Sequence, residues 1–286
     1  MAATATFLDE RYTLSDEQRD SFAKRGFLLV TDLLDADSKA AIKAWSDEVQ
    51  RWPNVPGKWM PYEETKADGT VGLCRTENFA NYHDGFQSLF RGARLTSVLA
   101  QLQGEDMVLF KEKINYKEPQ AGGFDAHTDA PAYKLENGAL KHLTINMAVD
   151  EATLENGCLE VVGGSHLQAV PLDANNCIDA AWEASQRWLA VPLQPGDVLI
   201  FGSFLAHRSG PNASTRPRAA IYATYNARSD GDNHDAYYSE RRQKWPATFE
   251  RKPGVDYAEG SLTYGFGSPM AGAAQHSRLQ QTARVR

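Results

Sequence analysis

The first hundred residues alternate short apolar runs with amphipathic, helix-like segments. The stretch Thr13-Leu-Ser-Asp-Glu-Gln has the residue types of a helix start, so we expect a helix over residues 15–25. Phe27-Leu-Leu-Val-Thr predicts a short strand, and residues 35–51 place their apolar side chains roughly on one side of a second helix. Residues 53–90 show little periodicity. We expect a long loop there, of the kind that is often functional inside a compact domain.

From residue 107 the hydrophobic period changes to two, which is typical of strands. The first strand is predicted to have one face with Leu109, Lys111, Lys113 and Asn115 and another with Val108, Phe110, Glu112, Ile114 and Tyr116. Residues 142–149 alternate equally well. Further strand-like runs, separated by turn signals, lie at 158–162, 188–193, 197–202 and 218–226. Helices followed by many short strands predict a mainly β fold, an antiparallel sandwich or barrel, with flanking helices.

This pattern contains no repeat or change of composition that would mark a second domain. We expect a single domain over residues 1–286. Its parts are a helical flank and substrate loop over 12–106, a β core over 107–228 and a C-terminal extension over 229–286. The extension is expected to lie over the mouth of the barrel.

Composition narrows the classes of partner and compartment. The chain is 42% hydrophobic and 23% charged, and its net charge of -7 argues against nucleic acid as a partner. Its three cysteines, Cys74, Cys158 and Cys177, show no CxxC spacing, which favours reduced thiols. The start of the chain lacks signal-peptide features, and no apolar run approaches the roughly 18 residues of a membrane span. We therefore expect a cytoplasmic protein without a membrane partner, as a monomer or homodimer.

Candidate metal ligands stand at two distant points of the β core. His127 and Asp129 are two residues apart, so on an extended strand both side chains lie on one face. His207 lies beside a turn, in Ala206-His-Arg-Ser-Gly-Pro-Asn. Two imidazoles and one carboxylate leave coordination positions open, which points to non-haem Fe(II) that binds a co-substrate and O2. Arg218 is suited to hold a carboxylate through two parallel hydrogen bonds.

Several segments in this order resemble the phytanoyl-CoA dioxygenase (PhyH) family of Fe(II)/2-oxoglutarate-dependent oxygenases. They are His127-Thr-Asp129, Glu155-Asn-Gly-Cys-Leu-Glu-Val-Val-Gly-Gly-Ser-His166, Pro195-Gly-Asp-Val-Leu-Ile-Phe and His207-Arg-Ser-Gly-Pro-Asn212, followed by Arg218. The resemblance implies a double-stranded β-helix (a jelly roll, cupin-like) over 107–228. It also implies a dioxygenase that hydroxylates, or otherwise oxidises, an unactivated C–H bond of a small organic substrate and releases succinate and CO2.

By this resemblance the iron ligands, and hence the catalytic residues, are His127, Asp129 and His207, and the co-substrates are 2-oxoglutarate and O2. Asp129 makes halogenation unfavourable, since halogenating relatives have a small residue at that position. A catalytically silent jelly-roll protein that binds a metal or 2-oxoglutarate is the rival interpretation. The complete set of ligands and the carboxylate anchor argue against it.

The resemblance also implies a binding site for 2-oxoglutarate. Arg218 is expected to bind the distal carboxylate, with Ser209 as its hydroxyl partner and Asn115 as a further contact. Arg216 is a rival for Arg218, only two residues away. We prefer Arg218 because the family's spacing from the second histidine fits it, and because Pro217 places Arg216 before the strand proper.

The sequence defines the substrate contacts least. Lys111 and Lys113, if they point inward, need anions and suit a carboxylate, phosphonate or phosphate on the substrate. If their strand lies at an edge, both lysines face water instead, and the two alternatives stay open at this point. Further candidates for contacts with the substrate are Tyr133, Thr144 and Asn146.

Two short segments point to a branch of the family. Phe110-Lys-Glu-Lys-Ile-Asn-Tyr-Lys and Pro56-Gly-Lys-Trp-Met are similar to the 2-aminoethylphosphonate dioxygenase branch. That branch has His-Gln-Asp where this chain has His127-Thr-Asp129. Oxygenases of fungal and bacterial natural-product synthesis share the scaffold, so a larger apolar substrate is the alternative.

Overall fold

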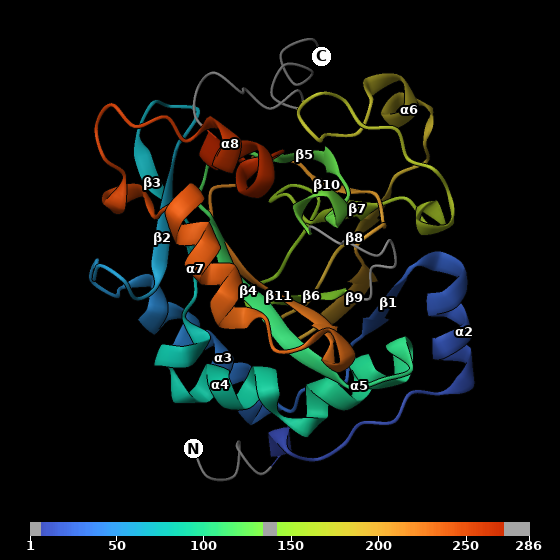
Figure 1. Ribbon diagram of the computed structural model, residues 1–286. Coiled ribbons are helices and arrows are strands. Elements are labelled where there is room, and N and C mark those ends of the chain that lie inside the picture. The colour runs from blue at the N-terminus through green and yellow to red at the C-terminus, as the bar shows by residue number, and fades with distance from the viewer. Residues whose placement is uncertain (1–6, 134–141, 272–286) are drawn as a thin grey trace.

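Two antiparallel β-sheets form the core of the computed structural model, which describes residues 7–133 and 142–271 (Figure 1). The larger sheet has seven strands in the order β1-β9-β6-β11-β4-β3-β2, and the smaller has four in the order β5-β10-β7-β8. Apolar side chains of both sheets, among them Phe27, Val161 and Phe201, meet in one buried cluster. The expected class, a mainly β jelly roll with flanking helices, is confirmed.

The strands of the larger sheet, in chain order, are β1 (Phe27–Val30), β2 (Met60–Thr65), β3 (Val71–Glu77), β4 (Met107–Lys117), β6 (Leu143–Ala148), β9 (Val198–Gly202) and β11 (Arg218–Ala227). Those of the smaller sheet are β5 (Phe124–His127), β7 (Leu159–Val161), β8 (Leu189–Val191) and β10 (His207–Ser209). The strand-like runs expected after residue 142 are confirmed.

Four helices, α2 (Asp16–Arg25), α3 (Ala36–Gln50), α4 (Asp84–Arg91) and α5 (Ala93–Gln103), pack against one face of the larger sheet (Figure 1). The two helices expected near the start of the chain are confirmed. The Ser15 hydroxyl accepts a hydrogen bond from the Gln18 N–H at the start of α2, and Gly26 ends that helix with φ of 78°. These helices leave the other face of the sheet to form the interior of the barrel.

The expectation of a long loop over residues 53–90 was wrong. This segment contains β2 and β3, which extend the larger sheet, followed by a short 3-10 helix (Ala80–Tyr82) and α4. In β2 the buried positions do alternate, but one of them is Glu64 and an exposed neighbour is Glu63. Because a carboxylate occupies a buried position, the alternation of apolar and polar residues is lost, and the sequence of this edge strand predicts a loop.

A bulge in β4 changes which of its side chains face the interior. Lys111 pairs with Thr224 of β11 and Leu109 pairs with Tyr225, so Phe110 is skipped in the pairing. Leu109 therefore joins the apolar cluster beneath the helices, whereas Phe110 packs against aromatic side chains of the interior. The predicted face assignment was wrong for these two residues, because a bulge inverts the alternation on one side of it.

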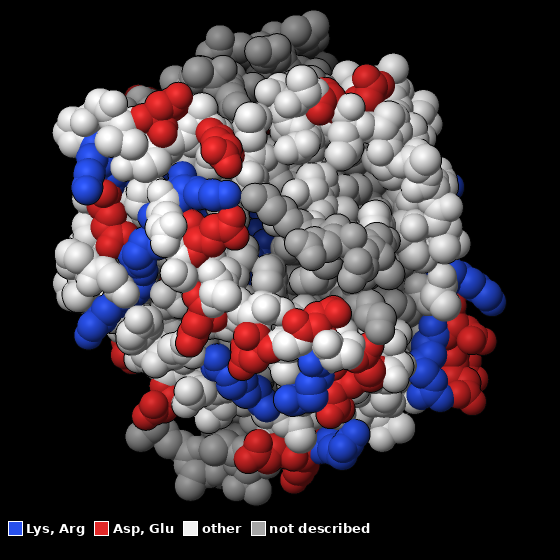
Figure 2. Space-filling view, viewed as in Figure 1, with Lys and Arg blue, Asp and Glu red and all other residues white. Residues whose placement is uncertain are grey.

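The C-terminal extension forms α7 (His234–Lys244), α8 (Ala258–Gly260) and a π-helical turn (Ser261–Gly265), and α7 lies beside β4 (Figure 1). None of the helices within residues 7–133 and 142–271 is long and apolar enough to cross a membrane. Figure 2 shows acidic and basic side chains interspersed over α4, α5 and α7, so this face offers no continuous basic patch to a polyanion.

Candidate active site

The three predicted metal ligands come together at the end of the smaller sheet. His127 ends β5 and pairs directly with His207 of β10. Their ring centroids are 4.2 Å apart, and one ligand atom from each of His127, Asp129 and His207 lies within 4.8 Å of the others. Asp129 reaches this place from a turn and not from an extended strand, since its φ and ψ are -73° and -18°. A single metal ion fits between the three groups.

Backbone carbonyls orient both imidazoles for metal binding. The Nδ1 atom of His127 is 2.6 Å from the Asp125 carbonyl oxygen, and that of His207 is 2.9 Å from the Leu205 carbonyl oxygen. Each Nδ1–H can therefore donate to a carbonyl and leave Nε2 free for a metal ion. Burial lowers the pKa of His127 to about 3, so the ring is neutral, as a ligand must be.

The third predicted ligand, Asp129, is a carboxylate that stays ionised. Burial alone raises the pKa of Asp129, but electrostatic interactions with His207, Lys111 and Lys113 outweigh it and lower the pKa below the usual range. Thr144 supports the same carboxylate, because its Oγ1 lies 3.4 Å from Asp129 Oδ2. The donor set of two neutral imidazoles and one carboxylate fits Fe(II).

Arg218 and Ser209 lie at a second polar centre, between β10 and β11. Arg218 is buried at the start of β11, where its Nε donates to the Asn156 carbonyl at 3.2 Å and its Nη2 to the Gly157 carbonyl. Ser209 is buried two residues after His207 on β10. Arg216 is exposed and precedes the strand. Only Arg218, of the two rival arginines, turns its charge to the interior.

Lys111 and Lys113 point inward, which answers the question that the sequence left open. Both line a cavity together with His127 and Asp129. Lys111 Nζ lies 4.8 Å from the ring centroid of Tyr133, and Lys113 Nζ lies 5.1 Å from that of Tyr222. Burial lowers the pKa of Lys111 to about 8 and that of Lys113 also falls. Within the described part of the chain, neither ammonium has a carboxylate within 4.0 Å.

The remaining predicted residues occupy the same interior face with different partners. Asn115 is buried, and its Oδ1 accepts a hydrogen bond of 2.8 Å from Arg75 Nε. Tyr133 stacks on His142, with ring centroids 4.5 Å apart. Asn146 Nδ2 lies 3.1 Å from the Tyr222 hydroxyl, while its Oδ1 is buried without a hydrogen-bond partner among the described residues.

The cavity wall contains polar residues that sequence reasoning missed. Glu77 accepts hydrogen bonds from Arg75 Nη1 at 3.0 Å and from Arg241 Nη2 at 2.8 Å, so β3 and α7 meet across one buried carboxylate. Tyr237 of α7 lines the same cavity. The residues of β3 were hidden by the predicted loop, and α7 had no apolar pattern that pointed inward. Lys117 of β4 is also buried, although it does not line this cavity, and it had a signal because it continues the alternate positions of Lys111, Lys113 and Asn115.

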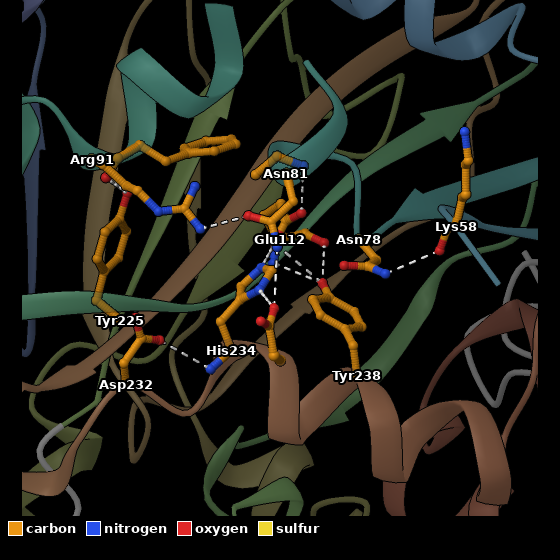
Figure 3. A network of polar contacts seen from close by, with 12 residues as sticks. Lys58, Asn78, Asn81, Arg91, Glu112, Tyr225, Asp232, His234 and Tyr238 are labelled. Carbon is orange, nitrogen blue, oxygen red and sulfur yellow. Dashed lines mark hydrogen bonds and ion pairs between the residues drawn. The ribbon is translucent and has the colours of Figure 1, made fainter. Parts of the chain in front are cut away.

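Glu112 is the centre of a polar network that fastens α7 to β4 (Figure 3). Its carboxylate accepts from the Ala80 N–H at 2.8 Å and lies 2.7 Å from His234 Nε2. The Tyr238 hydroxyl accepts from the Glu112 N–H at 2.9 Å and donates to the Glu112 carbonyl at 2.7 Å. This hydroxyl satisfies the edge of β4 just beyond the last pair that β3 makes with it.

The network matters for the cavity because of what lies on either side of it. Lys111 and Lys113 flank Glu112 in β4 and point to the opposite face. Tyr237 and Arg241 belong to the same helix as the network residues and line the cavity. The contacts of Glu112 with His234 and Tyr238 thus hold the two walls of the cavity that β4 and α7 form in a fixed position relative to each other.

Comparison with known proteins agrees with this geometry. The model of the family described as phytanoyl-CoA dioxygenase (PhyH) matches residues 22–220. The chain is 36% identical over 258 residues to a 2-aminoethylphosphonate dioxygenase of an uncultured bacterium, covering 90% of this chain and 98% of that protein. It is 38% identical over 234 residues to a methylphosphonate hydroxylase of Gimesia maris, covering 82% of this chain and 88% of that protein.

Solved structures share the fold. EctD from S. alaskensis, crystallised with 2-oxoglutarate and 5-hydroxyectoine, has a TM-score of 0.66 at 23% identity, and the match covers 78% of this chain and 81% of that one. The alternative of a silent binding protein is therefore set aside, because the family match and the named relatives are those of dioxygenases. The chain belongs to the phytanoyl-CoA dioxygenase (PhyH) family and is an Fe(II)- and 2-oxoglutarate-dependent dioxygenase.

Proposed function

We propose that this enzyme hydroxylates a C–H bond of a small organophosphonate, with iron bound by His127, Asp129 and His207. The bound iron and 2-oxoglutarate supply the oxidising species, and succinate and CO2 leave as co-products. The protein's own part is to hold the substrate carbon close to the metal, to hold the distal carboxylate of 2-oxoglutarate with Arg218 and Ser209, and to exclude water.

The two ammonium groups of Lys111 and Lys113 are the observation that supports this proposal most. The cavity has other charged residues, but they are already paired: Glu77 is bonded to Arg75 and Arg241. Lys111 and Lys113 have no such partner in the described ranges 7–133 and 142–271. Two desolvated ammoniums in one cavity are costly unless an anion joins them, and a phosphonate carries up to two negative charges.

Lys111 and Lys113 lie close enough to the proposed metal site for a substrate bound by them to reach the iron. Both lie near Asp129, whose pKa their charges lower. A phosphonate bound between them would place its first carbon atoms toward the metal side of the cavity. Near Asp129, the Thr224 hydroxyl lies 3.0 Å from that of Thr144 and 3.4 Å from that of Tyr133, and Thr144 in turn contacts the Asp129 carboxylate. The names of two relatives, at 36% and 38% identity, refer to small phosphonates.

We also assign the enzyme to the cytoplasm. The support is chemical: Cys74 and Cys158 are buried free thiols, which suits a reducing compartment.

A succinate-release assay tests the substrate class. Methylphosphonate and 2-aminoethylphosphonate are compared with methanesulfonate, which is tetrahedral but singly charged, and with acetate, which is planar. We expect only phosphonates to raise succinate release, with a new hydroxylated phosphonate in the phosphorus NMR spectrum. A screen in which no phosphonate acts, while another substrate class does, would refute the proposal.

Variants of the two lysines make the test specific to the site. Lys111→Met and Lys113→Met each remove one charged hydrogen-bond donor, so we expect the KM for the phosphonate to rise about 10-fold to 100-fold. Lys24→Met is the matched control, because Lys24 is exposed on α2. An unchanged KM in both cavity variants would contradict the assignment of these lysines.

A further inference from the structure

The active-site cavity carries more positive charge than a phosphonate dianion offsets. Its lining contains four cations among the described residues, which are Arg75, Lys111, Lys113 and Arg241. It also contains three carboxylates, but Asp129 belongs to the predicted metal site, and the carboxylate of Glu112 lies 2.7 Å from His234 Nε2 on the opposite face of β4. Glu77 is therefore left to offset the four cations.

Arg241 brings its charge to this cavity from beyond residues 22–220, the segment that the family model matches. The side chain is buried, and its Cζ lies 5.1 Å and 5.0 Å from the ring centroids of Tyr62 and Tyr264. Its Nη2 donates to Glu77 Oε1 at 2.8 Å, whereas its Nε is buried without a hydrogen-bond partner among the described residues. A guanidinium held in this way cannot turn away from a ligand in the cavity.

Glu77 offsets only part of this charge. Its Oε1 accepts from Arg241 and also from Arg75 Nη1, which is 3.0 Å away. Burial raises the pKa of Glu77, but the charges of the four cations outweigh this and lower it. One carboxylate thus already interacts with four positive charges. A fifth positive charge at this place would meet repulsion.

The cavity is small, with a volume of about 40 Å³, so every part of a substrate bound in it lies near these cations. A phosphonate dianion offsets two of them, whereas an ammonium on the same molecule adds one positive charge and loses its own hydration. We propose that Arg241 is a specificity-determining residue that excludes a cationic amino group, so that the enzyme selects phosphonates whose organic group is uncharged. This inference rests on the proposed function and deepens it.

The competing role is a salt bridge from a substrate ammonium to Glu77. Glu77 Oε2 accepts no hydrogen bond from any residue in the ranges 7–133 and 142–271, so it is open to such a donor. In that case Arg75 and Arg241 would only orient the carboxylate for the amine. The two roles predict opposite preferences between ligands that have the same shape but differ in charge.

2-Aminoethylphosphonate and propylphosphonate are such a pair, because the ammonium of the first takes the place of a methyl group in the second. Each is titrated into the anaerobic enzyme with Fe(II) and 2-oxoglutarate, and the change in the visible metal-to-ligand band gives its Kd without turnover. The wild type is compared with Arg241→Met and Arg242→Met. Arg242 is the matched control, because it follows Arg241 on α7 but pairs with Glu250 and does not line the cavity.

We expect the wild type and Arg242→Met to bind propylphosphonate about 10-fold to 100-fold more tightly than 2-aminoethylphosphonate. In Arg241→Met the two affinities should lie within about threefold of each other, because Glu77 and Arg75 then form a neutral pair. The ratio of two affinities within one protein is not changed by a general loss of stability. If Arg241→Met does not fold, Arg241→Gln, which keeps a donor for Glu77, takes its place.

A wild type that prefers 2-aminoethylphosphonate would show that Glu77 binds the amine, and one that binds both ligands equally would show no selection by charge. Either result would overturn this inference and leave the proposed function intact. An Arg241 variant that keeps the ratio of the wild type would refute the role of Arg241. If neither phosphonate binds, the proposed function fails and this inference fails with it.

Discussion

Replacing Tyr238 by phenylalanine removes one oxygen atom that satisfies both backbone groups of Glu112. The hydroxyl accepts from the Glu112 N–H at 2.9 Å and donates to its carbonyl at 2.7 Å, and both residues are buried. A buried hydrogen bond contributes about 1 kcal/mol, and leaving the N–H and the carbonyl unpaired adds the cost of their lost solvation. Tyr238→Phe should therefore destabilise the protein by about 2–4 kcal/mol.

The same change should weaken substrate binding without affecting 2-oxoglutarate. Lys111 and Lys113 flank Glu112, whereas Arg218, the proposed anchor of 2-oxoglutarate, pairs with the last residue of β4. Loosening this edge lets Lys111 and Lys113 move apart from the cavity wall that α7 forms. We expect the KM for the substrate to rise several-fold and the anaerobic Kd for 2-oxoglutarate to stay unchanged.

Urea unfolding measures the stability, the succinate-release assay gives the substrate KM, and anaerobic titration gives the Kd for 2-oxoglutarate. Tyr225→Phe is the matched control. The Tyr225 hydroxyl donates to the Phe90 carbonyl at 2.8 Å under the helices, so its loss should lower stability but leave the substrate KM unchanged. If Tyr238→Phe were as stable as the wild type, the hydrogen bonds of the Tyr238 hydroxyl to the Glu112 backbone would not contribute to stability. If Tyr225→Phe raised the substrate KM equally, the effect would follow from lower stability and not from the position of the lysines.

Three further predictions concern the metal, the co-substrate and pH. His127→Ala should abolish both Fe(II) binding and succinate release, measured by metal analysis and by assay; retained iron at full occupancy would contradict the ligand set. Arg218→Ala should raise the Kd for 2-oxoglutarate about 10-fold to 100-fold, while Arg216→Ala should leave it unchanged, and the reverse order would show that the wrong arginine was chosen. Burial lowers the pKa of His234, but its hydrogen bond and charge interaction with Glu112 outweigh this and raise it. The wild type should therefore have a larger free energy of unfolding than His234→Gln at pH values below the ordinary histidine pKa, and this difference should disappear as the pH rises through the raised pKa of His234. Urea unfolding of both proteins from pH 6 to pH 9 tests this.

The interior face of β4 shows how far periodicity alone can lead. Alternation after residue 107 placed Lys111, Lys113 and Asn115 on one face, and that face does form the barrel interior. It could not reveal the bulge at Phe110, because a skipped residue depends on the register with β11, a strand more than a hundred positions away. The local hydrophobic pattern predicts which residues share one face of a strand, whereas the pairing with the neighbouring strand determines where a bulge moves residues to the other face.

The polar walls of the cavity were beyond sequence reasoning for a different reason. Glu77, Arg75 and Arg241 are buried as a group, and each is tolerated only because the others neutralise it. In the sequence, each of these charged residues taken alone is typical of an exposed loop or of the exposed face of a helix. Such residues become recognisable only when the fold brings β3 and α7 together. By contrast, His127, Asp129, His207 and Arg218 could be chosen by resemblance, since the order and spacing of their motifs are specific.

Binding of a phosphonate by Lys111 and Lys113 beside the metal can be measured without turnover. The visible band of the anaerobic enzyme with Fe(II) and 2-oxoglutarate is followed while methylphosphonate is added, in the wild type and in Lys113→Met. We predict a saturable change of the band in the wild type and about 10-fold to 100-fold weaker binding in the variant. If methylphosphonate leaves the band unchanged, or changes it equally in both proteins, these lysines do not bind a phosphonate beside the metal.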